Sequence, residues 1–231
     1  MNERTLSVAL ADSISDEVIS CTGDIVEVGL DTIIDDGILK DVPILSTVIS
    51  LYKIGDSIRE RCNLKKIAVF VNELNKGIVS DGKKKEYREK FITNDKFRNQ
   101  QIEYLLVLID RYIGYDKPRL LAKLYLAYLD GIIIWEELTM YAEVVDRLLL
   151  LDYNTLKSPA EKWIVYRNIG GESILRLVAL GVMCEITETS SWIERENGHF
   201  SVTSESLTKL TSKEKIYKLT EFGEKLVNIL R

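Results

Sequence analysis

The densest apolar pattern in the chain lies in residues 102–151, where three helical patterns follow one another through very short connections. In the second and third patterns the apolar residues recur three and four positions apart, which is the period of one helix face. Short connections make neighbouring helices antiparallel, so the pattern predicts a helical core against which the rest of the chain packs. The two apolar stripes consist of Leu120, Leu121, Leu124, Ala127 and Tyr128, and of Leu138, Tyr141, Ala142, Val145 and Leu148.

The ends of these helices are marked by residues that favour helix termini. We expect Asp116 to cap the middle helix, because Pro118 follows in the first turn, where its missing amide hydrogen would have had no partner. Gly131 is expected to stop this helix in a left-handed conformation. Glu136 and Glu137 then fall in the first turn of the next helix, where negative charge is favourable.

Several further helices are predicted ahead of this core. The apolar spacing indicates helices at residues 5–20, 24–36 and 43–58. A fourth helix is expected to begin at Asn63 and to end at Gly77. Together with the core they predict a helical bundle.

Residues 29–52 contain two apolar helices joined at Gly37, with almost no basic charge. Two interpretations of this hairpin remain open: it packs on the central helices, or it leaves the soluble fold and inserts in a bilayer. Aspartates flank and interrupt its apolar runs, and carboxylates are costly inside lipid, which favours the packed hairpin. The residues that would face a partner or a membrane are Ile33, Ile34, Leu45, Val48, Ile49 and Tyr52.

Residues 80–98 are rich in basic side chains, with three aromatic residues between them. This composition allows a surface for the phosphates of nucleic acid. Two glutamates, however, lie three and four positions from lysines, as in the ion pairs of an exposed helix, and we favour this second interpretation. The basic residues considered for a phosphate surface are Lys83, Lys84, Lys85 and Arg88.

The character of the chain changes at residues 154–159, which have the composition of a polar linker. Beyond it, apolar periodicity predicts two helices, two strands separated by a long loop, and a last helix. This order describes a winged helix. We therefore predict a mainly α protein, with a helical bundle domain at residues 1–153 and a winged-helix-like α+β domain at 154–231. The predicted helices are residues 160–167, 172–180 and 221–230, and the predicted strands are residues 182–187 and 215–219.

Residues 177–182 and 217–226 resemble the recognition-helix end and the segment after the wing in many prokaryotic winged-helix domains. By this resemblance Gly181 makes the turn into the wing, and Thr220 caps the last helix. The second helix of such a pair enters the major groove of DNA, so its exposed face must supply hydrogen-bond donors.

The expected recognition helix supplies few such donors. Arg176 is the only basic residue between positions 172 and 180, and the wing loop at 190–212 is not basic either. Binding to a protein partner, or self-association, is therefore the preferred function of this domain. A DNA-binding transcriptional regulator remains the alternative.

Charge is distributed unevenly along the chain, whose net charge is −5. Residues 1–62 hold 5 basic and 12 acidic side chains, whereas residues 63–100 hold 10 basic and 5 acidic ones. An acidic first third argues against a general nucleic-acid coat. No secretory pattern and no run of about 20 apolar residues occurs, so we expect a cytoplasmic protein.

The residues of common catalytic and metal sites do not occur in recognisable patterns. The three cysteines, Cys21, Cys62 and Cys184, are widely spaced and odd in number, which predicts neither a disulfide framework nor a metal knuckle. His199, the only histidine, falls in an expected loop without a triad pattern nearby. We therefore predict a protein that is not an enzyme and that needs no cofactor or metal.

The corner at Asp130 and Gly131 invites comparison with a calcium-binding loop. With Gly131 as the sixth loop residue, Leu126 and Tyr128 would occupy the first and third ligand positions, and neither carries a carboxylate. Calcium binding is therefore not expected. The segment from Asp130 to Glu137 also resembles the helix pair of the TerB-like family, which is linked with tellurite resistance.

The layout of a helical region followed by a winged-helix end resembles the abortive-infection alpha family of prokaryotic phage-defence proteins. The terminal pattern Leu-Thr-x-x-Gly-x-x-Leu, from Leu219 to Leu226, is part of that resemblance. It implies an effector or sensor in phage defence or another stress response, acting through partners or through the membrane.

Overall fold

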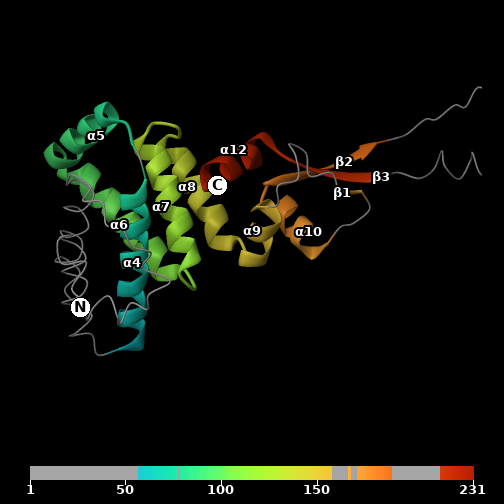
Figure 1. The fold of residues 1–231 in the computed structure, drawn as a ribbon, viewed down its shortest axis with the longest axis horizontal. Coiled ribbons are helices and arrows are strands. Elements are labelled where there is room, and N and C mark those ends of the chain that lie inside the picture. Colours follow the sequence, from blue (N-terminus) through green and yellow to red (C-terminus); the bar gives the residue numbers. More distant parts are fainter. Residues whose placement is uncertain (1–56, 78, 158–165, 168–170, 189–213) are drawn as a thin grey trace, which may run out of the picture. The chain divides into compact units, whose positions relative to one another are not determined.

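The computed structural model describes residues 57–77, 79–157, 166–167, 171–188 and 214–231 (Figure 1). These residues are mainly helical and include one small antiparallel sheet. They form two compact units that meet in the chain between Arg147 and Leu148. We call them the N-terminal unit and the C-terminal unit. The helices predicted at 5–20 and 24–36, and the hairpin at 29–52, lie outside the described residues.

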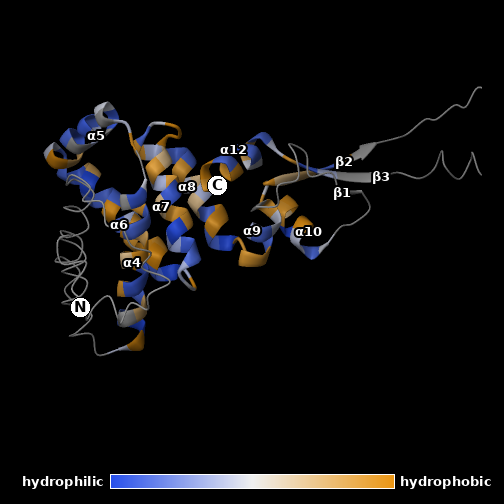
Figure 2. Ribbon diagram, in the orientation of Figure 1, coloured by the Kyte–Doolittle hydropathy of each residue, from blue (hydrophilic) through white to orange (hydrophobic). Residues whose placement is uncertain are grey.

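The described part of the N-terminal unit contains helices and no strand, as the periodicity of residues 102–151 predicts. Helix α7 packs against α4 and α8, while α6 contacts α4, α5 and α8. Its helices carry both apolar and polar residues in Figure 2, as expected where one face is buried and the other meets water. The helices of this unit are α4 (Ile58–Lys76), α5 (Asp81–Thr93), α6 (Asp95–Arg111), α7 (Asp116–Leu129) and α8 (Trp135–Arg147).

Both predicted apolar stripes face the interior. In α7, four of the five stripe residues are buried, and Tyr128 is half-buried. All five residues of the α8 stripe are buried, although Leu148 lies just beyond the end of that helix. The helical period alone therefore predicts which faces of α7 and α8 are covered.

Helix α4 begins earlier than expected. The Ser57 hydroxyl accepts a hydrogen bond from the Glu60 amide at 3.2 Å, and the Glu60 carboxylate accepts one from the Ser57 amide. This reciprocal arrangement is a capping box, which starts the helix at Ile58 and not at Asn63. The predicted start at Asn63 and the predicted helix end at position 58 are therefore wrong, whereas Gly77 does follow the last residue of α4.

Helix α7 begins and ends at the expected places, with one correction at its start. Asp116 is the first helical residue and makes no capping bond, and Tyr115 holds the capping position. Because Asp116 is already helical, its carboxylate contributes only as a negative charge in the first turn. Gly131 has a φ of +71°, which confirms the left-handed stop after this helix.

The C-terminal unit consists of three helices and three strands among its described residues. The strands pair antiparallel in the order β1, β3, β2, with Glu185 opposite Tyr217 and Met183 opposite Leu219. The predicted strands and the last helix are present to within one residue at each end. The elements are α9 (Leu150–Lys157), β1 (Tyr166–Arg167), α10 (Glu172–Ala179), β2 (Met183–Glu188), β3 (Glu214–Leu219) and α12 (Glu221–Leu230).

Two predictions about the start of this unit are wrong. Residues 154–157 continue helix α9 and are not a linker, so the predicted domain boundary after Tyr153 falls inside that helix. Residues 166 and 167 form β1 and do not end a helix. A strand of two residues has no periodicity to detect, because it exists only through its pairing with β3.

The pattern from Leu219 to Leu226 joins α12 to the start of β2. The Thr220 hydroxyl accepts from the Gly223 amide at 2.9 Å, which confirms the predicted cap, and donates to the Gly181 carbonyl at 2.7 Å. The Thr220 amide donates to the Val182 carbonyl at 3.0 Å. A Cβ atom at Gly223 would lie only 2.0 Å from that carbonyl oxygen, so the pattern needs a glycine for close backbone approach.

Candidate functional site

A pocket of about 430 Å³ lies in the N-terminal unit, between α5, the start of α6, and the corner that joins α7 to α8. Four aromatic side chains line it, together with two lysines and a glutamate from α5. Gln101 lines it from α6 and is only 2% exposed. Its aromatic and charged residues are Tyr87, Phe97, Tyr128, Trp135, Lys83, Glu86 and Lys90.

The rings form one continuous cluster. The ring of Tyr87 lies 5.9 Å from Phe97 and 6.0 Å from Tyr128, and Tyr128 lies 5.5 Å from Trp135. These separations and the tilted or edge-on orientations are those that aromatic pairs favour. The cluster explains why aromatic residues interrupt the basic stretch: Phe91 is buried, and Tyr87 and Phe97 are half-buried.

A hydrogen-bond network lies beneath these rings. The carbonyl oxygen of the Gln101 side chain accepts from the hydroxyls of Tyr87 and Tyr125, and the Gln101 amide donates to the Tyr128 hydroxyl at 2.9 Å. The hydroxyl oxygens of Tyr87 and Tyr125 also lie within hydrogen-bond distance of each other. The two tyrosine hydroxyls and the Gln101 oxygen are therefore in mutual contact. A buried glutamine needs such partners, because an unsatisfied buried amide is costly.

These tyrosines keep their protons at neutral pH. Burial raises the pKa of Tyr87 and of Tyr125 well above the ordinary value for tyrosine, and the neighbouring hydroxyls raise that of Tyr87 further. Their hydroxyls therefore exchange hydrogen bonds and do not act as bases.

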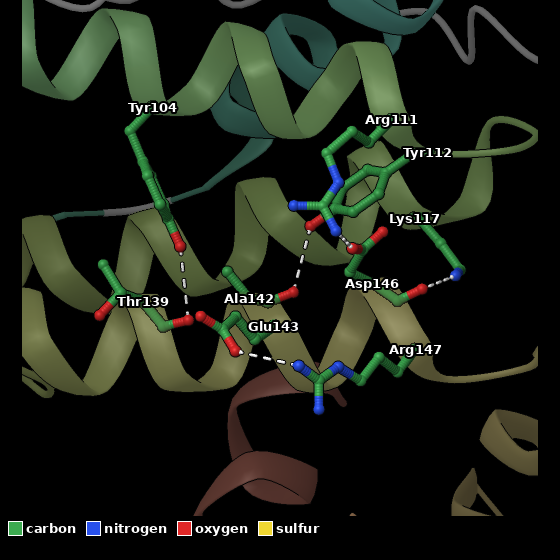
Figure 3. A network of polar contacts seen from close by, with 9 residues as sticks. All are labelled: Tyr104, Arg111, Tyr112, Lys117, Thr139, Ala142, Glu143, Asp146 and Arg147. Carbon is green, nitrogen blue, oxygen red and sulfur yellow. Dashed lines mark hydrogen bonds and ion pairs between the residues drawn. The ribbon is translucent and has the colours of Figure 1, made fainter.

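A second polar network joins α6 to α8 (Figure 3). The hydroxyls of Tyr104 and Tyr112 donate to the backbone carbonyls of Thr139 and Ala142, both at 3.4 Å. Further along α8, the Asp146 carboxylate pairs with Arg111, and the Asp146 carbonyl accepts from Lys117. Each residue drawn there makes a hydrogen bond or an ion pair with another of them, and we assign the network to helix packing.

The corner at Asp130 also has a structural role. One carboxylate oxygen of Asp130 accepts from both the amide and the hydroxyl of Ser80, at 3.1 and 3.0 Å. These hydrogen bonds hold the pKa of Asp130 below its usual range. They connect the end of α7 to the residue that precedes α5.

Arg176 of α10, the basic residue that would contact DNA in the alternative interpretation, is engaged within the C-terminal unit. Its Nε and one terminal nitrogen donate to the two carboxylate oxygens of Asp152 on α9, at 2.9 and 2.8 Å. The Asp152 side chain is 1% exposed, and the hydrogen bonds from Arg176 lower its pKa. The other terminal nitrogen of Arg176 lies 3.6 Å from the Glu172 carboxylate.

The remaining predicted site residues fall into two groups. Lys83 and Lys85 are exposed on α5, and Lys83 lies 3.9 Å from the Glu86 carboxylate, as expected for a solvated helix face. The side chains of Lys84 and Arg88 lie outside what the structure describes. The same holds for the whole predicted hairpin set, Ile33, Ile34, Leu45, Val48, Ile49 and Tyr52.

The buried hydrogen-bond network beside the pocket was not predicted from the sequence. Gln101 and Tyr125 come from α6 and α7 and meet Tyr87 of α5 only in the folded chain. The interleaved aromatic residues of 80–98 were the one available signal, since a purely solvated helix face has no need of them.

Within the described ranges, no cluster of histidine, cysteine, aspartate and glutamate side chains could hold a metal ion. No helix in those ranges has the length and apolar character needed to cross a membrane. No family model matches this chain, and comparison with curated proteins and with solved structures also gives no match.

Proposed function

We propose that this protein is a non-enzymatic interaction or effector protein, and that its C-terminal unit is a winged-helix-like module that binds another protein. The observation that carries this proposal is the pairing of Arg176 with Asp152. A guanidinium that recognises a base or a phosphate donates two parallel N–H hydrogen bonds to it. In Arg176 two such N–H groups already donate to the buried carboxylate of Asp152.

The order of elements supports the winged-helix interpretation. Helix α10 leads through Gly181, with a φ of +73°, into β2, and β3 returns antiparallel to it before α12. The short strand β1 adds to the other edge of β3. A helix followed by such a hairpin is the arrangement that places the second helix on the surface of a winged helix.

The outer face of α10 has the chemistry of a protein contact. Leu175 is 53% exposed at the middle of the helix, and Ala179 is exposed one turn later. Glu172 is exposed in the first turn, where its charge would repel a DNA backbone. An exposed aliphatic centre beside paired charges suits a partner that buries apolar surface.

The setting we propose is a cytoplasmic response of a prokaryotic cell, such as phage defence. This part of the proposal rests on the resemblance of the chain to the abortive-infection alpha family.

A photo-crosslinking amino acid at position 179, in the full chain and in living cells, tests the proposed interaction. We expect a discrete protein adduct, because Ala179 lies on the exposed face beside Leu175. Adding Leu175→Glu should abolish the adduct, since a charge in an apolar contact is costly. The same probe at Glu143, which is exposed on α8, is the matched control and should not give that adduct. Adducts to nucleic acid, or an adduct that Leu175→Glu leaves unchanged, would contradict the proposal.

A further inference from the structure

The pocket of the N-terminal unit has the dimensions of a small-molecule site and is not used by the proposed protein contact. Its volume of about 430 Å³ lies within the usual range of ligand pockets. The rings of Tyr87, Phe97, Tyr128 and Trp135 line it, and apolar Ile133 is buried against it. Walls of this kind favour a flat aromatic ligand, because ring pairs add attraction beyond the area that they bury.

Tyr128 lines this pocket, and its hydroxyl carries a proton that it can donate. The Tyr128 hydroxyl accepts from the Gln101 amide, which uses one of its lone pairs. Its own proton has no acceptor among the described residues. Burial also raises the pKa of Tyr128, so the hydroxyl keeps that proton at neutral pH. A group that accepts a hydrogen bond would complete this side of the pocket.

The charges along α5 indicate the sign of that group. Lys83 and Lys90 line the pocket together with one acidic residue, Glu86. The charge of Glu136 also acts on Tyr128 and adds to burial in raising its pKa. The Lys90 ammonium lies 4.3 Å from the centre of the Phe97 ring, a cation–π contact that holds it at the pocket wall. The two lysines would repel a ligand cation and attract an anion.

The geometry points to a binding site for a small planar aromatic anion, whose ring lies among Tyr87, Tyr128 and Trp135. Its carboxylate or phosphate would accept a hydrogen bond from the Tyr128 hydroxyl and pair with Lys90 or Lys83. Carboxylate and phosphate share this recognition chemistry, since both are anionic acceptors that a lysine can pair with.

Calorimetric titration of the full chain with three probes tests the site. The first probe is 2-naphthoate, which has both the ring and the charge. 2-Naphthamide keeps the ring without the charge, and cyclohexanecarboxylate keeps the charge without the aromatic ring. We expect 2-naphthoate to bind with a Kd below about 1 mM and about tenfold more tightly than either analogue. Equal affinity for the acid and the amide, or no binding of 2-naphthoate at 1 mM, would overturn the proposal.

Point variants locate the binding in the pocket. Tyr128→Phe keeps the ring and removes the donor, and should weaken 2-naphthoate binding about tenfold. Lys90→Gln should weaken it about threefold, because the ammonium is exposed to solvent. Lys85→Gln is the matched control: it removes an exposed lysine of α5 that does not line the pocket, and binding should not change. Circular dichroism checks that each variant is folded. Binding that folded Tyr128→Phe and Lys90→Gln proteins leave intact would place the ligand elsewhere and refute this site.

Discussion

Replacement of Gly223 by alanine is expected to lower the free energy of unfolding of the C-terminal unit by about 3 kcal/mol. The added Cβ would lie 2.0 Å from the Val182 carbonyl oxygen, far inside any tolerated contact. This neighbour is backbone and cannot rotate away. It also accepts the hydrogen bond of the Thr220 amide, so α12 and β2 must separate or distort together. Amide hydrogen exchange of residues 214–231 should accelerate strongly in the variant.

Gly82→Ala is the control for this substitution. Gly82 lies in α5 and has no heavy atom within 4 Å of an added Cβ. Alanine is the better helix former, so stability should be unchanged or should rise by up to about 1 kcal/mol. Unchanged exchange in the C-terminal unit of Gly223→Ala would show that the close approach of α12 and β2 does not exist in solution.

The second large effect is expected from Asp152→Asn, which should destabilise the C-terminal unit by about 2 kcal/mol at neutral pH. The substitution keeps the shape of the side chain. It removes the charge and replaces one of the two acceptor oxygens that the Arg176 fork uses, at a position that is 1% exposed. Thermal unfolding followed by circular dichroism measures the change. Asp95→Asn is the control, because its ion pair with Arg98 is exposed and should contribute less than about 1 kcal/mol.

The same carboxylate makes the free energy of unfolding depend on pH in the acid range. Hydrogen bonds from Arg176 hold the pKa of Asp152 below its ordinary value in the folded state. Its contribution is therefore complete above the unfolded-state pKa of about 4 and is lost as the pH falls through the lower, folded value. Asp152→Asn should flatten the loss of stability below about pH 4. If the free energy of unfolding of the variant falls just as steeply below about pH 4, this carboxylate is not paired in solution.

Much of the local structure follows from sequence patterns that act over one or two turns. The helical period predicts the buried stripes of α7 and α8, and Gly131 and Thr220 mark termini through backbone conformation and capping. The start of α4 was also predictable, because serine at 57 and glutamate at 60 have the spacing of a capping box. Asn63 lies inside α4, and its side-chain amide donates to the Asp110 carboxylate.

Features that depend on distant residues could not be predicted in this way. Strand β1 exists through its pairing with residues 216 and 217, which lie about fifty positions away. The Arg176 pair joins two elements, and the sequence shows only that acidic residues are plentiful. From the sequence alone Arg176 is a candidate for contact with DNA, whereas in the fold its guanidinium donates to Asp152 of α9.

The pocket illustrates the same limit for function. Its wall combines residues of α5, α6, α7 and α8. These residues are spread along the sequence and do not make up a recognisable motif. The basic residues of 80–98 favoured a solvated face, and the exposure of Lys83 and Lys85 agrees with that interpretation. The aromatic residues of the same stretch pack into the cluster around Tyr87.

We propose that the C-terminal unit binds protein and does not read DNA, because the guanidinium of Arg176 is paired with Asp152. Titration of a labelled duplex with the full chain, at low and at moderate salt, tests it most directly. We predict binding weaker than about 1 µM, lost at moderate salt and unchanged by Arg176→Ala in protein shown to be folded. Lys85→Ala, on the exposed face of α5, should reduce any residual low-salt binding. Tight binding with a steep salt dependence that Arg176→Ala weakens, and that Lys85→Ala does not, would contradict the claim.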